Sequence, residues 1–302
     1  MKKIQVCVGV DVDSVAGWIG SYGGEDSPAD IQRGVFAAEV GIPRMLRLLE
    51  RHSVPATFFI PGHSIESFPR EMQMVADAGH EIGAHGYTHE NPTSLSLEQE
   101  RVILEKSIEL IDRLCGRPPV GYVAPWLELS ENTIDLLVRN GFSYDHTQQF
   151  DDFTPFYARS GDSWTAIDYD QAAESWMRPY VSGAPVDLVV LPPNWYLSDF
   201  TPMVFIKKMS NSHGWVSPRS IEQDWRDQFD WIYREMDYAV FSLNTHPDAS
   251  GRPQIAAMLE RFIQYVARHP GVEFVTMEAA AAQYRRRVPF DSVAPSRTER
   301  NQ

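Results

Sequence analysis

Short apolar runs alternate with longer amphipathic stretches along almost the whole chain, and this alternation limits the folds that the sequence can adopt. The apolar runs, each of which predicts a strand, lie at residues 4–10, 56–60, 81–84, 120–123, 142–144, 187–191, 238–243 and 272–275. The amphipathic stretches, each of which predicts a helix, lie at residues 43–51, 68–79, 97–115, 130–141, 221–236, 255–268 and 277–286. Strands that alternate with helices predict a parallel sheet, and roughly seven such units favour a barrel, regular or distorted, over an open sheet.

The chain is predicted to form one α/β domain. Its length of 302 residues suits one large domain, and no internal repeat or interdomain linker interrupts it. We expect residues 1–287 to form the barrel and residues 288–302 to form a solvated or disordered tail. Between the strands, the glycine-rich stretch 17–26 predicts a long loop. The segment 145–185, rich in aromatic residues and aspartate, predicts irregular structure with short strands.

The composition and charge narrow the range of partners. The net charge of -14 argues against nucleic acids and anionic membranes, because both favour clustered lysine and arginine. The two cysteines, Cys7 and Cys115, cannot form a disulfide framework and favour a reducing compartment. The first apolar run ends at Asp11 without a small-residue cleavage site, and no apolar stretch reaches the ~20 residues of a membrane span. We therefore predict a cytoplasmic protein that acts on a small molecule.

Two histidines stand four residues apart just after the third apolar run. His85 and His89 can converge on one divalent metal ion, for which imidazole is the commonest nitrogen ligand. Asp11 and Asp13, at the end of the first apolar run, offer a base beside a third ligand, although turn chemistry is the alternative reading of this pair. Two carboxylates so close would repel each other if buried, unless a cation compensates. A site made of Asp13 and the two histidines suits zinc, and also iron, cobalt or manganese.

Further polar and aromatic residues follow other predicted strands, at the edge where barrel enzymes place their chemistry. A lone His246 would more often be a core histidine, but its position at a strand end predicts a general acid for a departing nitrogen. In the expected mechanism, the metal ion polarises a carbonyl group and acidifies its bound water. Asp11 takes the proton from that water, and His246 protonates the leaving nitrogen. We expect Trp126, Asn194 and Trp195 to contact the substrate.

The chain resembles the NodB-homology polysaccharide deacetylases, carbohydrate esterase family 4, over most of its length, roughly residues 4–284. The resemblance rests on the strand-end residues Asp11, Asp13, His85, His89 and His246. It implies a deformed (β/α) barrel of about seven or eight strands. It also implies that Asp11 is the catalytic base and that Asp13, His85 and His89 are the metal ligands.

Four segments are similar to one subgroup of that family, namely residues 17–39, 122–126, 194–196 and 246–253. The subgroup contains peptidoglycan deacetylase-like proteins of gastric bacteria, bacterial cyclic imide hydrolases and, more distantly, metal-independent allantoinases. These motifs do not separate the first two kinds of enzyme.

The chain departs from the family pattern at its third motif. Val123 stands where the family has an arginine that pairs with the catalytic aspartate. Arg252, in the loop after the last catalytic histidine, is a candidate substitute partner for Asp11. Trp126 is bulkier than the tyrosine expected there and would narrow the cleft.

The catalytic residues do not choose between substrates, because opening a cyclic imide and removing an acetyl group use the same chemistry. The predicted cytoplasmic placement and several tryptophans on loops favour an enclosed pocket; these tryptophans are Trp18, Trp126, Trp164, Trp195 and Trp215. A small cyclic imide or related amide is therefore the first expectation, and an N-acetyl sugar of a polysaccharide or peptidoglycan is the alternative. A catalytically decayed barrel that serves as a binding module is the non-enzyme alternative. The aromatic loops also make a homo-oligomer plausible.

Overall fold

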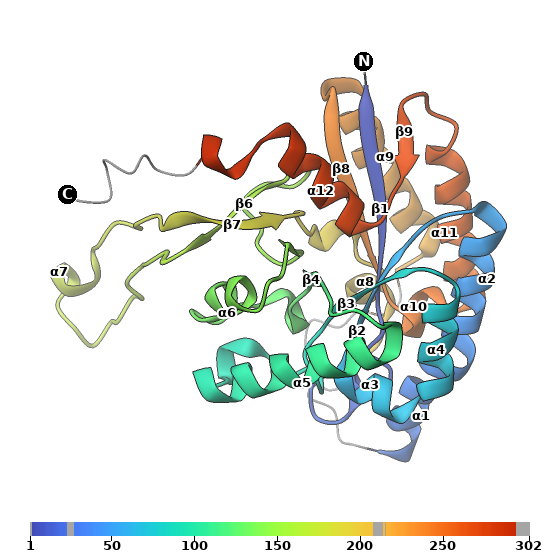
Figure 1. Cartoon of the computed structure of the whole chain (residues 1–302), viewed down its shortest axis with the longest axis horizontal. Helices are drawn as coiled ribbons and strands as arrows, with labels where there is room; N and C mark the ends of the chain where they lie inside the picture. The colour runs from blue at the N-terminus through green and yellow to red at the C-terminus, as the bar shows by residue number, and fades with distance from the viewer. Residues whose placement is uncertain (1, 23–26, 208–213, 215, 294–302) are drawn as a thin grey trace.

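The strands of the computed structural model form a single curved sheet (Figure 1). The structure describes residues 2–22, 27–207, 214 and 216–293. The strands are β1 (Lys3–Asp11), β2 (Thr57–Ile60), β3 (Glu81–Ala84), β4 (Gly121–Tyr122), β5 (Tyr144–Asp145), β6 (Phe156–Ser160), β7 (Ala184–Val190), β8 (Tyr238–Thr245) and β9 (Val272–Phe274). They pair in the order β6-β7-β5-β4-β3-β2-β1-β8, and β9 also pairs with β1. The pairing of β6 with β7 is antiparallel and the other pairings are parallel.

The sheet curves into a half-barrel. Among the described residues, the ladder of paired strands ends at β6 on one side and at β8 on the other. Contacts across the remaining gap include a parallel bridge between Ser198 and Asn244, and a hydrogen bond of 2.9 Å from the Val240 N–H to the Phe153 carbonyl oxygen. This architecture is the deformed α/β barrel that the sequence predicts, so the predicted fold class is confirmed.

Helices cover the outer face of the sheet. The helices of the described chain, of which α7 lies away from the sheet, are α1 (Pro28–Phe36), α2 (Ile42–His52), α3 (Gly62–Ser67), α4 (Pro69–Asp77), α5 (Leu97–Cys115), α6 (Thr133–Arg139), α7 (Ala173–Trp176), α8 (Phe200–Met203), α9 (Pro218–Glu235), α10 (Pro247–Ser250), α11 (Pro253–Val266) and α12 (Met277–Arg287). Figure 1 shows α2 between α4 and α11 along one side, and α2 packs against both. No helix of the described chain combines the length and the apolar character that crossing a bilayer requires.

Strand β1 shows how the alternation of side chains positions the site. Val6, Val8 and Val10 pack into the larger hydrophobic cluster, while Cys7 packs into a second cluster on the opposite face. Because side chains alternate between the two faces of a strand, Asp11 lies on the same face as Cys7. The carboxylate at the strand end is thereby directed into the barrel.

The structure adds a helix that the sequence pattern does not predict. Helix α1 begins after Ser27, whose side chain accepts a hydrogen bond from the Asp30 N–H, and Pro28 occupies its first turn. A π-helical turn over Ala37–Gly41 then connects α1 to α2. Of the loop predicted over 17–26, residues 23–26 lie outside the described residues.

The segment predicted to be irregular forms a projecting arm. Strands β6 and β7, with the short helix α7 between them, extend away from the body of the molecule (Figure 1). Aromatic side chains on the arm are open to solvent: Trp164 is 74% exposed and Tyr169 is 87% exposed. Beyond α12, the ring of Phe290 still packs on Tyr157, with ring centres 5.0 Å apart. Residues 294–302 of the predicted tail lie outside the described residues.

Candidate active site and metal centre

Asp13, His85 and His89 meet at the carboxyl-terminal edge of the sheet, where β1 and β3 end. The Nε2 atom of His85 is 3.3 Å from Oδ1 of Asp13, and the Nε2 atom of His89 is 3.6 Å from Oδ2 of the same carboxylate. All three side chains are buried, and one ligand atom of each lies within 4.8 Å of the others. The structure thus brings together the three residues that the sequence predicts as metal ligands.

Hydrogen bonds from the other ring nitrogens fix the orientation of both histidines. Nδ1 of His85 lies 2.8 Å from the carbonyl oxygen of Val123 and donates to it. Nδ1 of His89 lies 2.7 Å from Oγ of Ser21, whose hydroxyl in turn donates to the carbonyl oxygen of His89. Each bond leaves the lone pair of Nε2 facing the centre, which is the usual arrangement of a metal-binding histidine. Val123, which replaces the arginine of the family, therefore contributes through its backbone.

The free atoms and charges of this cluster fit a divalent metal ion. Oδ1 of Asp13 and Nε2 of His85 are buried and have no hydrogen-bond partner among the described residues. Burial lowers the pKa of His89 to about 4, so this histidine is neutral and able to bind a metal at pH 7. Burial alone would raise the pKa of Asp13, but His89 and His85 lower it overall, so the carboxylate is ionised. Buried polar atoms without partners are costly unless something binds them, and a metal ion would satisfy both.

Asp11 lies beside the cluster but has a different set of partners. Its Oδ2 atom accepts a hydrogen bond of 2.7 Å from Nδ2 of Asn244 on β8. Its Oδ1 atom is buried without a hydrogen-bond partner in the described part of the chain. Burial is the largest influence on Asp11 and raises its pKa. A carboxylate with a raised pKa and one free oxygen is suited to accept a proton.

His246 presents its Nε2 atom to the two carboxylates, 3.7 Å from Oδ2 of Asp11 and 3.9 Å from Oδ2 of Asp13. Its Nδ1 atom is 2.8 Å from Oδ1 of Asp199, a buried carboxylate that also accepts hydrogen bonds from the His246 N–H and the Ser250 hydroxyl. Burial would lower the pKa of His246, but Asp199, with Asp13 and Asp11, raises it to about 10. Asp199 therefore keeps a proton on His246, as a general acid requires.

Replacing Asp199 by asparagine is expected to lower kcat by roughly 10²–10⁴-fold, because His246 would lose both its orientation and its proton. Metal content should stay at the wild-type level, since Asp199 lies outside the Asp13, His85 and His89 cluster. The matched control is Ser250→Ala, which removes a donor to Asp199 but leaves the carboxylate in place, and it should cost less activity. Unchanged kcat in Asp199→Asn would show that His246 does not need this partner.

Arg252 does not pair with Asp11, so the predicted substitute for the family arginine is wrong. Among the described residues its guanidinium forms no ion pair; it lies 3.5 Å from the centre of the Phe36 ring. Its Nε atom is directed to the carbonyl oxygen of Asp248, at 3.4 Å. Helix α10 turns the chain away from the site before Arg252 is reached. Asn244, on strand β8 itself, holds Asp11 instead.

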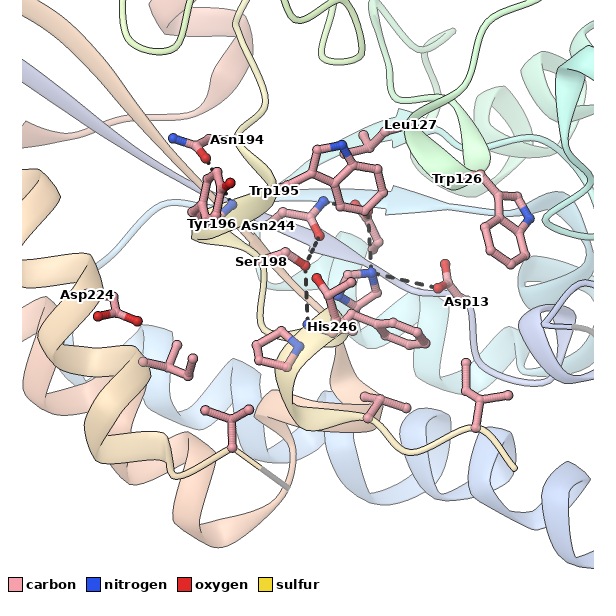
Figure 2. Close-up of a pocket in the computed structure, with 18 of the residues that line it drawn as sticks. Asp13, Trp126, Leu127, Asn194, Trp195, Tyr196, Ser198, Asp224, Asn244 and His246 are labelled. Atoms are coloured by element: carbon pink, nitrogen blue, oxygen red, sulfur yellow. Dashed lines mark hydrogen bonds and ion pairs between the residues drawn. The ribbon is translucent and has the colours of Figure 1, made fainter. Parts of the chain in front are cut away.

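A cavity of about 1180 Å³ opens above the cluster, and the predicted substrate residues Trp126, Asn194 and Trp195 all line it. Figure 2 shows Trp126 and Trp195 near Asp13 and His246. The polar atoms of Asn194 already bind within the protein, since its Oδ1 accepts from the backbone at residue 196 and its Nδ2 donates to a side chain on α9. Trp126 has a φ of 65°, a left-handed conformation that is rare outside glycine and is often found at functional sites.

The other loop tryptophans do not form the predicted enclosure. Trp18 is buried and donates a hydrogen bond to Asp248, and Trp164 is exposed on the projecting arm. Neither lines the cavity above the cluster. Trp215 lies outside the described residues.

Four residues of the site are not identified by the sequence reasoning: Ser21, Tyr22, Asp199 and Asn244. Asn244 carried a usable signal, because it lies two residues before His246 and is a polar residue at the end of a buried strand. The other three lie in stretches without periodicity, where no pattern distinguishes them from ordinary loop residues.

Comparison with known proteins places the chain in a family. Residues 34–144 match the family model described as polysaccharide deacetylase. The chain is 57% identical over 288 residues to the peptidoglycan deacetylase of Helicobacter pylori, covering 95% of this chain and 98% of that protein. It is 39% identical to a peptidoglycan deacetylase-like protein of Gibberella zeae, covering 94% of this chain and 87% of that protein.

A solved structure agrees with these sequence matches. A crystal structure from Mycobacterium smegmatis, described provisionally as a polysaccharide deacetylase, superposes with a TM-score of 0.79 at 30% identity and covers 95% of this chain and 91% of that chain. The chain therefore belongs to the polysaccharide deacetylase family, whose deacetylases are metal-dependent hydrolases of carbon–nitrogen bonds other than peptide bonds.

Proposed function

We propose that the protein removes the acetyl group from N-acetylated amino sugars of the kind found in peptidoglycan. The observation that carries the proposal is the match at 57% identity, over nearly the whole chain, to a protein named peptidoglycan deacetylase. The geometry is consistent with this reaction, because a base, an acid and a metal-binding cluster converge beneath one cavity. The convergence of all these groups also argues against a decayed barrel.

Asp13, His85 and His89 would hold the metal ion, and Asp11 and His246 would move the protons. When bound, the ion supplies Lewis-acid chemistry toward the acetyl carbonyl group and the attacking water. Asp11 is placed to accept a proton from the water through its free Oδ1 atom. His246 is placed to donate a proton to the amide nitrogen, so that the amino sugar leaves as a neutral amine.

Zinc is the ion that we propose for this centre. Two imidazole nitrogens and one carboxylate oxygen leave open positions for substrate and water, as catalytic zinc sites do. Cobalt, iron and manganese accept the same donors and are the alternatives. Metal analysis of the protein as purified identifies the ion that it carries.

The cyclic imide that the sequence reasoning placed first is less well supported than the sugar. The cavity, at about 1180 Å³, exceeds the ~300–1,000 Å³ of usual small-molecule sites, so a five-membered ring would leave most of it unfilled. Of the tryptophans expected to close the site, Trp18 is buried and Trp164 lies on the arm, and neither lines the cavity. Two relatives that match over most of their length, at 57% and 39% identity, have peptidoglycan deacetylase in their names.

The test is to offer two substrates side by side: an N-acetylglucosamine oligomer, scored by acetate release, and succinimide, scored by ring opening. Acetate release that disappears with a chelator and returns with zinc is the expected result. Ring opening without acetate release would overturn the proposal and restore the cyclic imide. Running a chitin oligomer beside peptidoglycan fragments then separates a general sugar deacetylase from one that needs the peptidoglycan repeat.

Homo-oligomer formation and the cytoplasmic location remain predictions. For the homo-oligomer, the projecting arm is the candidate contact surface, because its exposed aromatic side chains include Trp164 and Tyr169. Light scattering on the wild-type protein and on a Trp164→Ser, Tyr169→Ser variant measures the oligomeric state directly. A monomeric wild type would contradict the prediction of a homo-oligomer.

A further inference from the structure

Two neighbouring residues in the loop after β1 contact two different ligands of the metal centre. The Tyr22 hydroxyl donates a hydrogen bond of 2.5 Å to Oδ2 of Asp13. The Ser21 hydroxyl oxygen lies 2.7 Å from Nδ1 of His89. The dipeptide Ser21-Tyr22 therefore holds both the carboxylate of Asp13 and the imidazole of His89.

The contact of Tyr22 distinguishes the two oxygens of Asp13. Oδ2 is held by the phenol, whereas Oδ1 is buried without a hydrogen-bond partner in the described residues and faces Nε2 of His85 at 3.3 Å. The phenol thereby fixes the rotation of the carboxylate and leaves Oδ1 as the oxygen that is free to bind an ion. Without the hydroxyl, the carboxylate could rotate or offer both oxygens.

The contact of Ser21 fixes both the ring and the backbone of His89. The hydroxyl donates to the His89 carbonyl oxygen at 2.5 Å, so its own oxygen is left to accept from Nδ1 of the ring. It also accepts a hydrogen bond of 3.1 Å from Nε1 of Trp126, a residue that lines the cavity. His89 has a φ of 58°, so its backbone needs such support to remain in a left-handed conformation.

The loop that carries the dipeptide is itself anchored in the core. The Tyr22 ring packs edge-on against Trp18, with ring centres 5.0 Å apart, and the Trp18 indole N–H donates to the buried Asp248. A Cβ atom at Gly17 would lie 2.3 Å from the Tyr22 ring, so only glycine leaves space for the phenol. Side chains that are locked by packing can position metal ligands accurately.

We propose that Ser21 and Tyr22 are positioning residues that set the affinity and the coordination geometry of the metal centre. This inference rests on the metal centre of the proposed function. It adds that these two residues of the loop after β1, which are not themselves ligands, determine how tightly the three ligands bind the ion.

The first test is cobalt(II) binding to the metal-free Tyr22→Phe protein, followed by competition with a chelating dye and by the visible absorption of the bound ion. We expect affinity to fall about 10–100-fold, the usual cost of losing such an outer partner, and the absorption bands to shift as the carboxylate changes its binding mode. Tyr265→Phe is the matched control, because its hydroxyl makes a similar bond, 2.6 Å, to the distant carboxylate of Asp230. This control should bind cobalt as the wild type does.

The second test separates the hydroxyl of Ser21 from its bulk. Ser21→Ala should also weaken cobalt binding about 10-fold or more, whereas Ser21→Thr, which keeps the hydroxyl, should restore it. Gly17→Ala keeps both hydroxyl groups but displaces the Tyr22 ring, and it should resemble Tyr22→Phe.

The outcomes distinguish a failure of the metal centre from a failure of the positioning role alone. If the wild-type protein binds no cobalt, the metal centre fails, and the proposed function fails with it. If the wild type binds cobalt and Tyr22→Phe and Ser21→Ala bind it equally well with the same spectrum, only the positioning role is overturned. Thermal unfolding of each metal-free variant reports whether the fold is retained, and the cobalt spectrum is compared among the variants that unfold like the wild type.

Discussion

Replacement of Asp11 by asparagine is expected to reduce kcat by roughly 10²–10⁴-fold, the usual contribution of a general base. Asparagine has nearly the same shape as aspartate, and its carbonyl oxygen can still accept the hydrogen bond that Asn244 donates. What it cannot do is take up a proton. The loss should therefore fall on turnover and leave the fold intact. Steady-state kinetics of acetate release with saturating zinc measures it.

Metal content gives the Asp11→Asn experiment its control. Asp11 does not belong to the cluster of three ligands, so the variant should bind one ion per chain as the wild type does. Asp112→Asn, on the exposed face of α5, tests whether loss of a carboxylate elsewhere has any effect. An Asp11→Asn enzyme with normal turnover would mean that another group accepts the proton, and the assigned base would be wrong.

Removal of the metal ion is expected to abolish turnover and also to destabilise the fold. An ion that binds the folded chain alone stabilises it by about 2.7 kcal/mol when its free concentration is 100 times Kd. For a chain of this size that corresponds to roughly 5 °C in Tm. The stabilisation arises because Oδ1 of Asp13 and Nε2 of His85 are otherwise buried without a hydrogen-bond partner among the described residues. Differential scanning calorimetry with and without chelator measures the shift.

The variant His85→Ala, which lacks one ligand, shows whether the metal-dependent change in Tm comes from this site. It should lose most metal affinity, and its Tm should not respond to zinc in the range where the wild type does. A wild-type Tm that is the same with chelator and with zinc would contradict the prediction. A zinc-dependent Tm in His85→Ala would place the stabilising ion elsewhere in the protein.

The sequence predicts the fold and the core of the site because both depend on periodicity. Parallel strands end at a common edge, so residues that follow β1, β3 and β8 are brought together even though they are far apart in the chain. Asp11, Asp13, His85, His89 and His246 follow this rule. The family resemblance then gives them roles, and the structure places them at distances that suit those roles.

The rest of the site depends on loop conformation, which periodicity does not describe. Asp199 reaches His246 from the turn before α8, and Ser21 and Tyr22 reach the ligands from the loop after β1. Arg252 misled the prediction because it is close to His246 in sequence, but a short helix separates them and directs it to an aromatic ring. The number of loop tryptophans misled the choice of substrate for a similar reason, since the count does not show which of them face the cavity.

The position of β1 between early and late strands sets the order in which the enzyme can be completed during synthesis. The three metal ligands have all been made once residue 89 is added. Strand β1, however, pairs along residues 3–10 with β8. The hydrogen bond that Asp11 accepts comes from Asn244, which lies 233 residues later in the chain. Contacts so distant in sequence are slow to form and leave apolar surface open in the meantime. Strand β1 therefore lacks its β8 partner until that strand is made, and Asp11 and His246 come together for proton transfer only when the carboxyl-terminal third has folded onto β1.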